Sequence, residues 1–152
     1  MNEFNEYTDE IISIRRLLEF IPTDDLEWDE SGVITMDDIS NAIDKIPELS
    51  EPYGDTYAYP VREQKSREWH IGRIIYFIRH PDEITGIEID NECFNGLISV
   101  QPFIVDGWHR WAAAIWLYNK NTFKQISCKY GGRLDVLEYL KDEIDELDYD
   151  PV

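Results

Sequence analysis

The chain has 152 residues, of which 43% are hydrophobic and 13% aromatic, and its formal net charge is −18. This apolar content predicts a folded domain rather than a disordered chain, and no apolar run approaches the ~18 residues that a membrane span needs. Two cysteines and three scattered histidines fit neither a disulfide framework nor a zinc-binding spacing. The first ten residues are acidic, unlike a secretory or transit signal. We therefore expect a soluble, cytoplasmic protein without membrane contact.

The negative charge is concentrated at the two ends of the chain. Residues 1–60 hold 16 acidic and 3 basic residues, residues 61–133 hold 8 and 10, and residues 134–152 hold 8 and 1. A field of this sign opposes binding to phosphate backbones, so direct DNA binding is not expected. It suits docking on a basic protein partner, and it equally suits simple solubility.

Residues 1–60 are expected to form a short, acidic, helical N-terminal segment. Thr8 is placed to cap a first helix that Pro22 ends. The apolar residues between them recur at helical spacing, and they are Ile11, Ile14, Leu18 and Ile21.

A second helix is predicted near Met36, because Thr35 and Asp38 have the spacing of a capping box. Pro47 ends it. The stretch 47–60 contains three prolines and one glycine, which is typical of a linker. The chain is therefore predicted to divide into the N-terminal segment 1–60 and a second domain, 61–152.

The second domain alternates between helices and strands. Its predicted elements are a helix capped near Ser66 and closed at His80-Pro81, strands over 86–90 and 102–106, a buried helix over 111–118, a strand over 125–130, a turn at Gly131-Gly132, and a last, acidic helix over 137–147. This order predicts an α+β fold with a small mixed sheet and packed helices.

The stretch IVDGWHRW, residues 104–111, places charged and polar residues where a buried strand meets a buried helix. A helix N-terminus has unpaired N–H groups and accepts anions. Gly107 lets the backbone approach a ligand, and the guanidinium of Arg110 can form two hydrogen bonds with a phosphate. His109 can shuttle a proton, and Asp106 can orient it or hold a metal ion beside the phosphate. The stretch thus predicts a phosphate-binding turn with His109 and Asp106 as catalytic candidates. The alternative is a structural turn capped by Asp106.

The longer stretch QPFIVDGWHRWAAAIWL resembles the nucleotide-contacting motif of the ParB/sulfiredoxin-like superfamily, and the resemblance extends over roughly residues 66–140. It implies that Gly107, His109 and Arg110 contact the phosphates of a nucleotide, with Mg²⁺ as a companion ion. Some members of the superfamily transfer phosphate or cleave nucleic acid, so phosphoryl-transfer and phosphodiesterase activity are candidate chemistries.

Two departures from that family bear on function. Trp108 stands where sulfiredoxins have their catalytic cysteine, which excludes sulfiredoxin chemistry. The ParB branch continues into a basic DNA-binding domain, whereas this chain continues into the acidic KDEIDELDYDPV. Partition-type spreading on DNA is therefore not expected.

Further candidates lie outside the turn. Asp90 belongs to an alternating acidic face with Glu88 and Glu92, and it can hold a metal if that face lines the turn; otherwise the face is simply solvated. Arg133 is a candidate for a second phosphate contact or for a structural role.

Residues 27–38 can be laid on a calcium-loop template, with Glu27, Asp29, Ser31 and Asp38 as ligands around Gly32. Such loops normally begin with Asp and end with Glu. Because both key ligands are replaced, Ca²⁺ binding at 27–38 is not expected, and a polar loop between two helices is the simpler interpretation.

Two functional hypotheses follow. The first is a domain that binds a nucleotide or another phosphorylated small molecule at the Gly-Trp-His-Arg turn. The second is an acidic, DNA-mimicking inhibitor or immunity protein of the phage anti-defence type, whose charged ends block a nucleic-acid-binding partner. The first predicts sensitivity to loss of Arg110, whereas the second predicts sensitivity to charge reversal and to salt.

Overall fold

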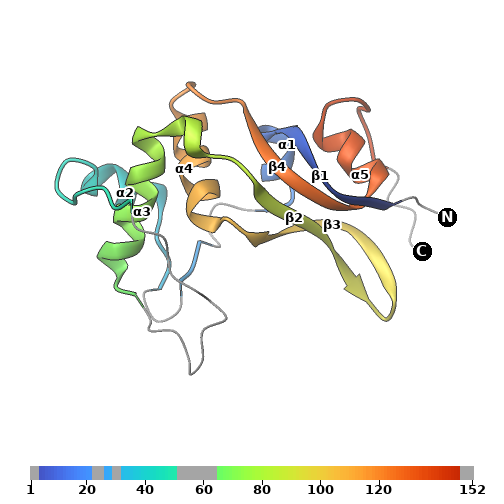
Figure 1. The fold of residues 1–152 in the computed structure, drawn as a ribbon, viewed down its shortest axis with the longest axis horizontal. Helices are drawn as coiled ribbons and strands as arrows, with labels where there is room; N and C mark the ends of the chain where they lie inside the picture. The colour runs from blue at the N-terminus through green and yellow to red at the C-terminus, as the bar shows by residue number, and fades with distance from the viewer. Residues whose placement is uncertain (1–3, 22–25, 29–31, 51–64, 148–152) are drawn as a thin grey trace.

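The computed structural model describes residues 4–21, 26–28, 32–50 and 65–147 (Figure 1). These residues form a small α+β fold with one four-stranded mixed sheet and five α-helices. The strands are β1 (Phe4–Ser13), β2 (Ile87–Phe94), β3 (Leu97–Asp106) and β4 (Gln125–Arg133). The helices are α1 (Ile14–Leu18), α2 (Met36–Ala42), α3 (Arg67–Arg79), α4 (Trp108–Asn119) and α5 (Leu134–Leu140).

The strand order in the sheet is β1-β4-β2-β3. β1 runs antiparallel to β4, β2 runs antiparallel to β3, and the two central strands β4 and β2 are parallel. Figure 1 shows α3 and α4 gathered toward one end of the sheet, and α1 and α5 toward the other. The connection from β3 into α4 therefore lies where the sheet meets the α3–α4 pair.

The expectation of a helix over residues 8–21 is wrong for its first half. Residues 4–13 form β1, and the helix begins only at Ile14, with the Ser13 hydroxyl accepting the N–H of Arg16. Ile11 is 60% exposed and Ile12 is fully buried, which is the alternation of a strand. Pairing with β4 outweighs the helical spacing, because a short isolated helix is marginal without packing. The N-terminal segment is thus not purely helical. The predicted boundary at residue 60 lies outside the described residues.

The second and third predicted helices are confirmed, with the expected N-caps. Thr35 and Asp38 form the capping box of α2, and Ser66 caps α3. α2 ends at Ala42, earlier than Pro47. The last helix, α5, ends at Leu140 rather than continuing to residue 147. The predicted strands are present, and β2 and β3 extend further than expected to form a hairpin.

The expected turn at Gly131-Gly132 is wrong, because both glycines lie inside β4. A Cβ on Gly131 would lie 2.5 Å from the ring of Tyr7, which crosses β4 at this point so that its hydroxyl donates to Asp90. A Cβ on Gly132 would lie 2.3 Å from Oδ1 of Asn91. The two glycines are therefore needed for close approach on both faces of the strand rather than for a reversal of the chain.

Helix α4 occupies the centre of the core, as its apolar sequence predicts. Trp111, Ile115 and the three alanines between them are fully buried. α4 packs on α3 and against the sheet. In the part of the chain that the structure describes, no helix is long and apolar enough to cross a membrane.

Candidate functional site

Gly107 forms the turn between β3 and α4. Its φ is +106°, it is the N-cap of α4, and no side chain caps this helix end. A Cβ at this position would lie 3.1 Å from Nη2 of Arg110 and 3.3 Å from Cα of Ile87. Glycine is therefore required both by the positive φ and by the close approach to β2. Asp106 precedes the turn, and the N-cap residue itself is a glycine that has no side chain to cap the helix.

Arg110 lies beside this turn. Its Nη1 donates to the carbonyl of Thr85, and its Nη2 lies 3.6 Å from Oδ2 of Asp106. The Arg110 side chain is 23% exposed, and that of Asp106 is 72% exposed. The guanidinium is thus fixed in position next to the helix N-terminus, with only a loose ion pair to a solvated carboxylate.

The side chain of His109, in the first turn of α4, points away from Arg110 and packs against α3. Its Nε2 lies 2.9 Å from Nδ1 of His70, a fully buried residue. The indole of Trp28 stacks on the His109 ring with a centroid distance of 4.9 Å, and Trp69 contacts the same ring edge-on at 5.8 Å. Two histidines and two tryptophans from three segments therefore form one aromatic cluster.

This environment lowers the pKa of His109 from 6.5 to about 3. Loss of solvent is the main cause, followed by the nearby His70 and the positive charges of Arg73 and Arg110. His109 is therefore neutral at physiological pH. A neutral imidazole can exchange a hydrogen bond with His70, but it adds no positive charge toward a phosphate.

Arg133 and Asp90 are not gathered at this turn. The guanidinium of Arg133 is buried, donates to both carboxylate oxygens of Asp135 at 3.0 and 2.8 Å, and donates to the Ile98 carbonyl. Asp90 accepts the Tyr7 hydroxyl, which raises the pKa of Tyr7 to about 12. Both residues belong to the part of the sheet around Asn91, four residues along β2 from Ile87, or roughly 13 Å.

No group of three or more metal-ligating side chains occurs among the described residues. Asp29 and Ser31 of the calcium-loop template lie outside the described residues. Asp38, the last ligand of that template, accepts the N–H of Thr35 at 2.9 Å and pairs with Arg67 at 2.7 Å. Its carboxylate therefore already caps α2 and pairs with the guanidinium of Arg67.

The contacts of His70, Trp28 and Trp69 with His109 could not be predicted from a sequence pattern. His70 lies on the same helix as the apolar stripe of α3, and its pairing with His109 depends on how α3 and α4 pack. The one indication in the sequence is that His70 directly precedes Ile71, the first residue of the apolar face of α3.

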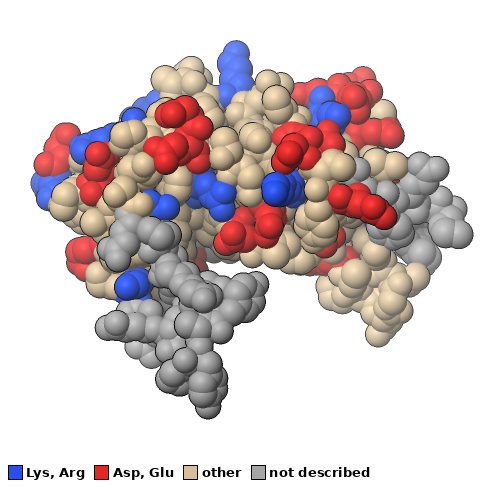
Figure 2. All heavy atoms as spheres, viewed as in Figure 1, with Lys and Arg blue, Asp and Glu red and all other residues tan. Residues whose placement is uncertain are grey.

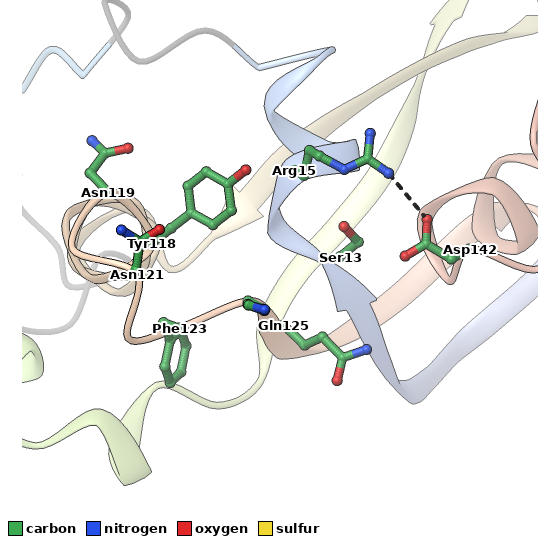
Figure 3. A pocket seen from close by; sticks show the side chains of 9 residues that line it. Ser13, Arg15, Tyr118, Asn119, Asn121, Phe123, Gln125 and Asp142 are labelled. Carbon is green, nitrogen blue, oxygen red and sulfur yellow. Dashed lines mark ion pairs between the residues drawn. The ribbon is translucent and has the colours of Figure 1, made fainter.

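A hollow of about 690 Å³ lies elsewhere, beside the loop that joins α4 to β4 (Figure 3). It is lined by Ser13, Arg15, Tyr118, Asn119, Asn121, Phe123, Lys124, Gln125 and Asp142. These residues come from three distant stretches of the chain, so no sequence motif marks the hollow.

Comparisons of the chain with models of protein families, with curated proteins and with solved structures find no match.

Proposed function

We propose that the turn between β3 and α4 binds the phosphate group of a nucleotide or of another phosphorylated small molecule. The observation that carries this proposal is the N-terminus of α4, which has glycine at its N-cap, no capping side chain, and an arginine fixed beside it. A 12-residue helix presents partial positive charge at this end, and N–H groups at a helix N-terminus without a capping side chain suit phosphate oxygens.

Arg110 supports the proposal through its position and its weak existing partner. One nitrogen of its guanidinium is anchored on the Thr85 carbonyl, which holds the side chain in place. The other faces Asp106 across 3.6 Å, longer than a hydrogen bond. A phosphate at the turn would give Arg110 a closer acceptor than Asp106 at little cost of rearrangement.

We extend the proposal to the superfamily that the sequence resembles. The Gly-Trp-His-Arg turn between β3 and α4, with α3 before the hairpin and β4 after the helix, is the arrangement that a ParB/sulfiredoxin-like domain would have. This order supports the assignment of residues 66–140 to such a domain, and it makes a nucleotide the first ligand to test.

At this turn the phosphate is bound rather than chemically changed, and His109 serves to position the first turn of α4. Its Nε2 is engaged with His70, and its lowered pKa keeps it neutral. It therefore orients the first turn of α4 against α3 rather than carrying the charge. Asp106 is exposed and lies next to the turn, so it is the residue that would hold a Mg²⁺ ion accompanying the phosphates.

The test is thermal melting of the protein with ATP, CTP, GTP and ADP, each with magnesium. A ligand at 100 times its Kd stabilises the folded state by about 2.7 kcal/mol, which is roughly 5 to 10 °C for a chain of this size. Arg110→Ala should abolish the shift. Arg79→Ala, which removes an exposed arginine of α3, is the control and should keep it. A well-folded protein that no nucleotide stabilises would contradict the proposal.

A second candidate function rests on the acidic surface. The chain has 32 acidic and 14 basic residues, and Figure 2 shows acidic side chains gathered around α5. Asp145, which follows this helix, has a fully exposed side chain. This surface would suit an inhibitor that presents DNA-like charge to a basic partner. Such an inhibitor would tolerate Arg110→Ala and lose binding on charge reversal near α5, with steep weakening by salt.

A further inference from the structure

Several polar side chains that line the hollow beside the α4–β4 loop have no partner in the part of the chain that the structure describes. Among the described residues, none of the following side chains forms a hydrogen bond or an ion pair: Tyr118, Asn119, Asn121, Lys124 and Gln125. They come from the end of α4, the loop after it and the start of β4. In Figure 3 the Tyr118 hydroxyl points across the hollow toward Arg15, and Asn121 lies beneath the tyrosine ring.

Arg15 faces the same space and is only loosely held. Its Nη2 lies 3.7 Å from Oδ1 of Asp142, whereas Nε of Arg16 donates to the same oxygen at 2.7 Å. Asp142 is therefore bound mainly by Arg16, and the Arg15 side chain is 61% exposed. Most other arginines differ from Arg15, because each donates a hydrogen bond: Arg16, Arg67, Arg73, Arg79, Arg110 and Arg133.

The lining of this hollow carries more positive than negative charge, unlike the chain as a whole. Two cations, Arg15 and Lys124, and one carboxylate, Asp142, line it, in a chain whose net charge is −18. Two carbonyls at the nearby end of α4 are already paired. The carbonyl of Leu117 accepts from Thr122, and that of Tyr118 accepts from the N–H of Asn121. This pairing reduces the repulsion that the end of the helix would exert on an anion beside the two cations.

We propose that this hollow, the Arg15–Lys124 pocket, binds a small hydroxyl-bearing anion of the sugar-phosphate class. Its volume of about 690 Å³ lies within the range of ligand sites. The two cations suit a phosphate. The three amides each offer a donor and an acceptor, which is what a row of hydroxyl groups requires. The half-buried rings of Tyr118 and Phe123 offer apolar faces for the carbon skeleton of the ligand.

This pocket is separate from the turn at Gly107. Gly107 precedes the first residue of α4, whereas Tyr118 and Asn119 are its last two residues. The length of the helix, roughly 18 Å for 12 residues, therefore lies between the two sites. The pocket does not depend on the function proposed for the turn, and either site can exist without the other.

The experiment is an NMR titration of the full chain with glucose 6-phosphate, with glucose and inorganic phosphate as matched probes. Glucose 6-phosphate should bind with a Kd below about 1 mM, at least about tenfold more tightly than either probe. The amide signals of Ser13, Asn121 and Gln125, which line the pocket, should move. Binding of either probe as tight as that of glucose 6-phosphate, or no binding at all, would overturn the assignment.

Variants place the ligand within the pocket. Arg15→Ala should weaken glucose 6-phosphate binding by about tenfold or more, since it removes a charged donor, and the exposed position of Arg15 leaves the fold intact. Lys129→Ala removes one exposed positive charge of β4 outside the pocket and should leave the Kd within about twofold. Equal weakening by Arg15→Ala and Lys129→Ala would show general charge attraction and refute the pocket.

Discussion

Replacement of Gly107 by alanine tests the geometry of the turn most directly. The backbone there has φ +106°, where an alanine is strained by about 1 to 3 kcal/mol. The new Cβ would also press on Cα of Ile87 at 3.3 Å and on Nη2 of Arg110 at 3.1 Å. The backbone of β2 cannot retreat without disturbing its pairing with β4, so the Arg110 guanidinium must move from the Thr85 carbonyl.

Loss of that charged hydrogen bond costs about 1.5 to 3 kcal/mol. Together with the backbone strain, Gly107→Ala should lower the free energy of unfolding by about 2.5 to 6 kcal/mol. This is a large share of the total stability of a typical domain. The measurement is urea denaturation followed by tryptophan fluorescence, with the midpoint and slope fitted separately so that a change in compactness is distinguished from a change in stability.

Gly96→Ala is the matched control. Gly96 has φ +79°, and a Cβ there would meet nothing within 4 Å. Its cost should therefore be the backbone strain alone, about 1 to 3 kcal/mol. The difference between the two variants isolates the contacts at Gly107. Equal losses for both variants would refute the claim that close approach to Ile87 and Arg110 requires glycine in this turn.

Two further predictions concern buried polar groups. Because the pKa of His109 is about 3 in the folded chain and 6.5 in the unfolded one, the unfolded state binds more protons between these values, and stability should fall as the pH drops from about 6.5 toward 3. His109→Asn should flatten this dependence in denaturation midpoints measured from pH 7 to pH 4; an unchanged slope would contradict the assignment. Asn91→Ala should cost about 2 to 4 kcal/mol, because it leaves the Tyr130 hydroxyl and the Arg133 N–H without their buried acceptor. The exposed Asn41→Ala should change stability by less than about 0.5 kcal/mol, and similar losses for the two asparagine variants would show that burial is not the cause.

The parts of the fold that could be predicted from the sequence are those that local patterns determine. The capping box of Thr35 and Asp38 and the serine cap at Ser66 each satisfy backbone groups within one turn, so they are readable without tertiary contacts. The wholly apolar run from Trp111 to Tyr118 predicts a central helix because any exposed face would be costly.

The errors arise where a distant partner decides the local structure. Apolar residues recur at helical spacing from Ile11 to Ile21, yet residues 8–13 pair with β4 as a strand. Gly131 and Gly132 have the composition of a turn, yet the bulk of Tyr7 and Asn91 on either face of β4 is what requires them. Neither partner is close in sequence, so spacing alone favours the wrong structure in both places.

The candidate site shows the same division between local and distant determinants. That Gly107 and Arg110 lie together follows from their separation by three residues across a helix start. That His109 faces His70 depends on the packing of α3 on α4, and the contact with Trp28 depends on a residue 81 positions earlier in the chain. The motif therefore identified where the turn is, but not which of its side chains lies beside the helix N-terminus and which packs against α3.

The burial of α4 explains why the two polar residues of the motif separate. Most of the helix is enclosed by the core, so side chains of its first turn have few directions open to them. Arg110 extends to the segment before β2, where the Thr85 carbonyl accepts from it, and its charge stays at the helix N-terminus. His109 packs between Trp28 and α3, where loss of solvent keeps it neutral. Affinity for an anion at this turn would consequently come from backbone N–H groups and from Arg110, with His109 holding the helix end in place.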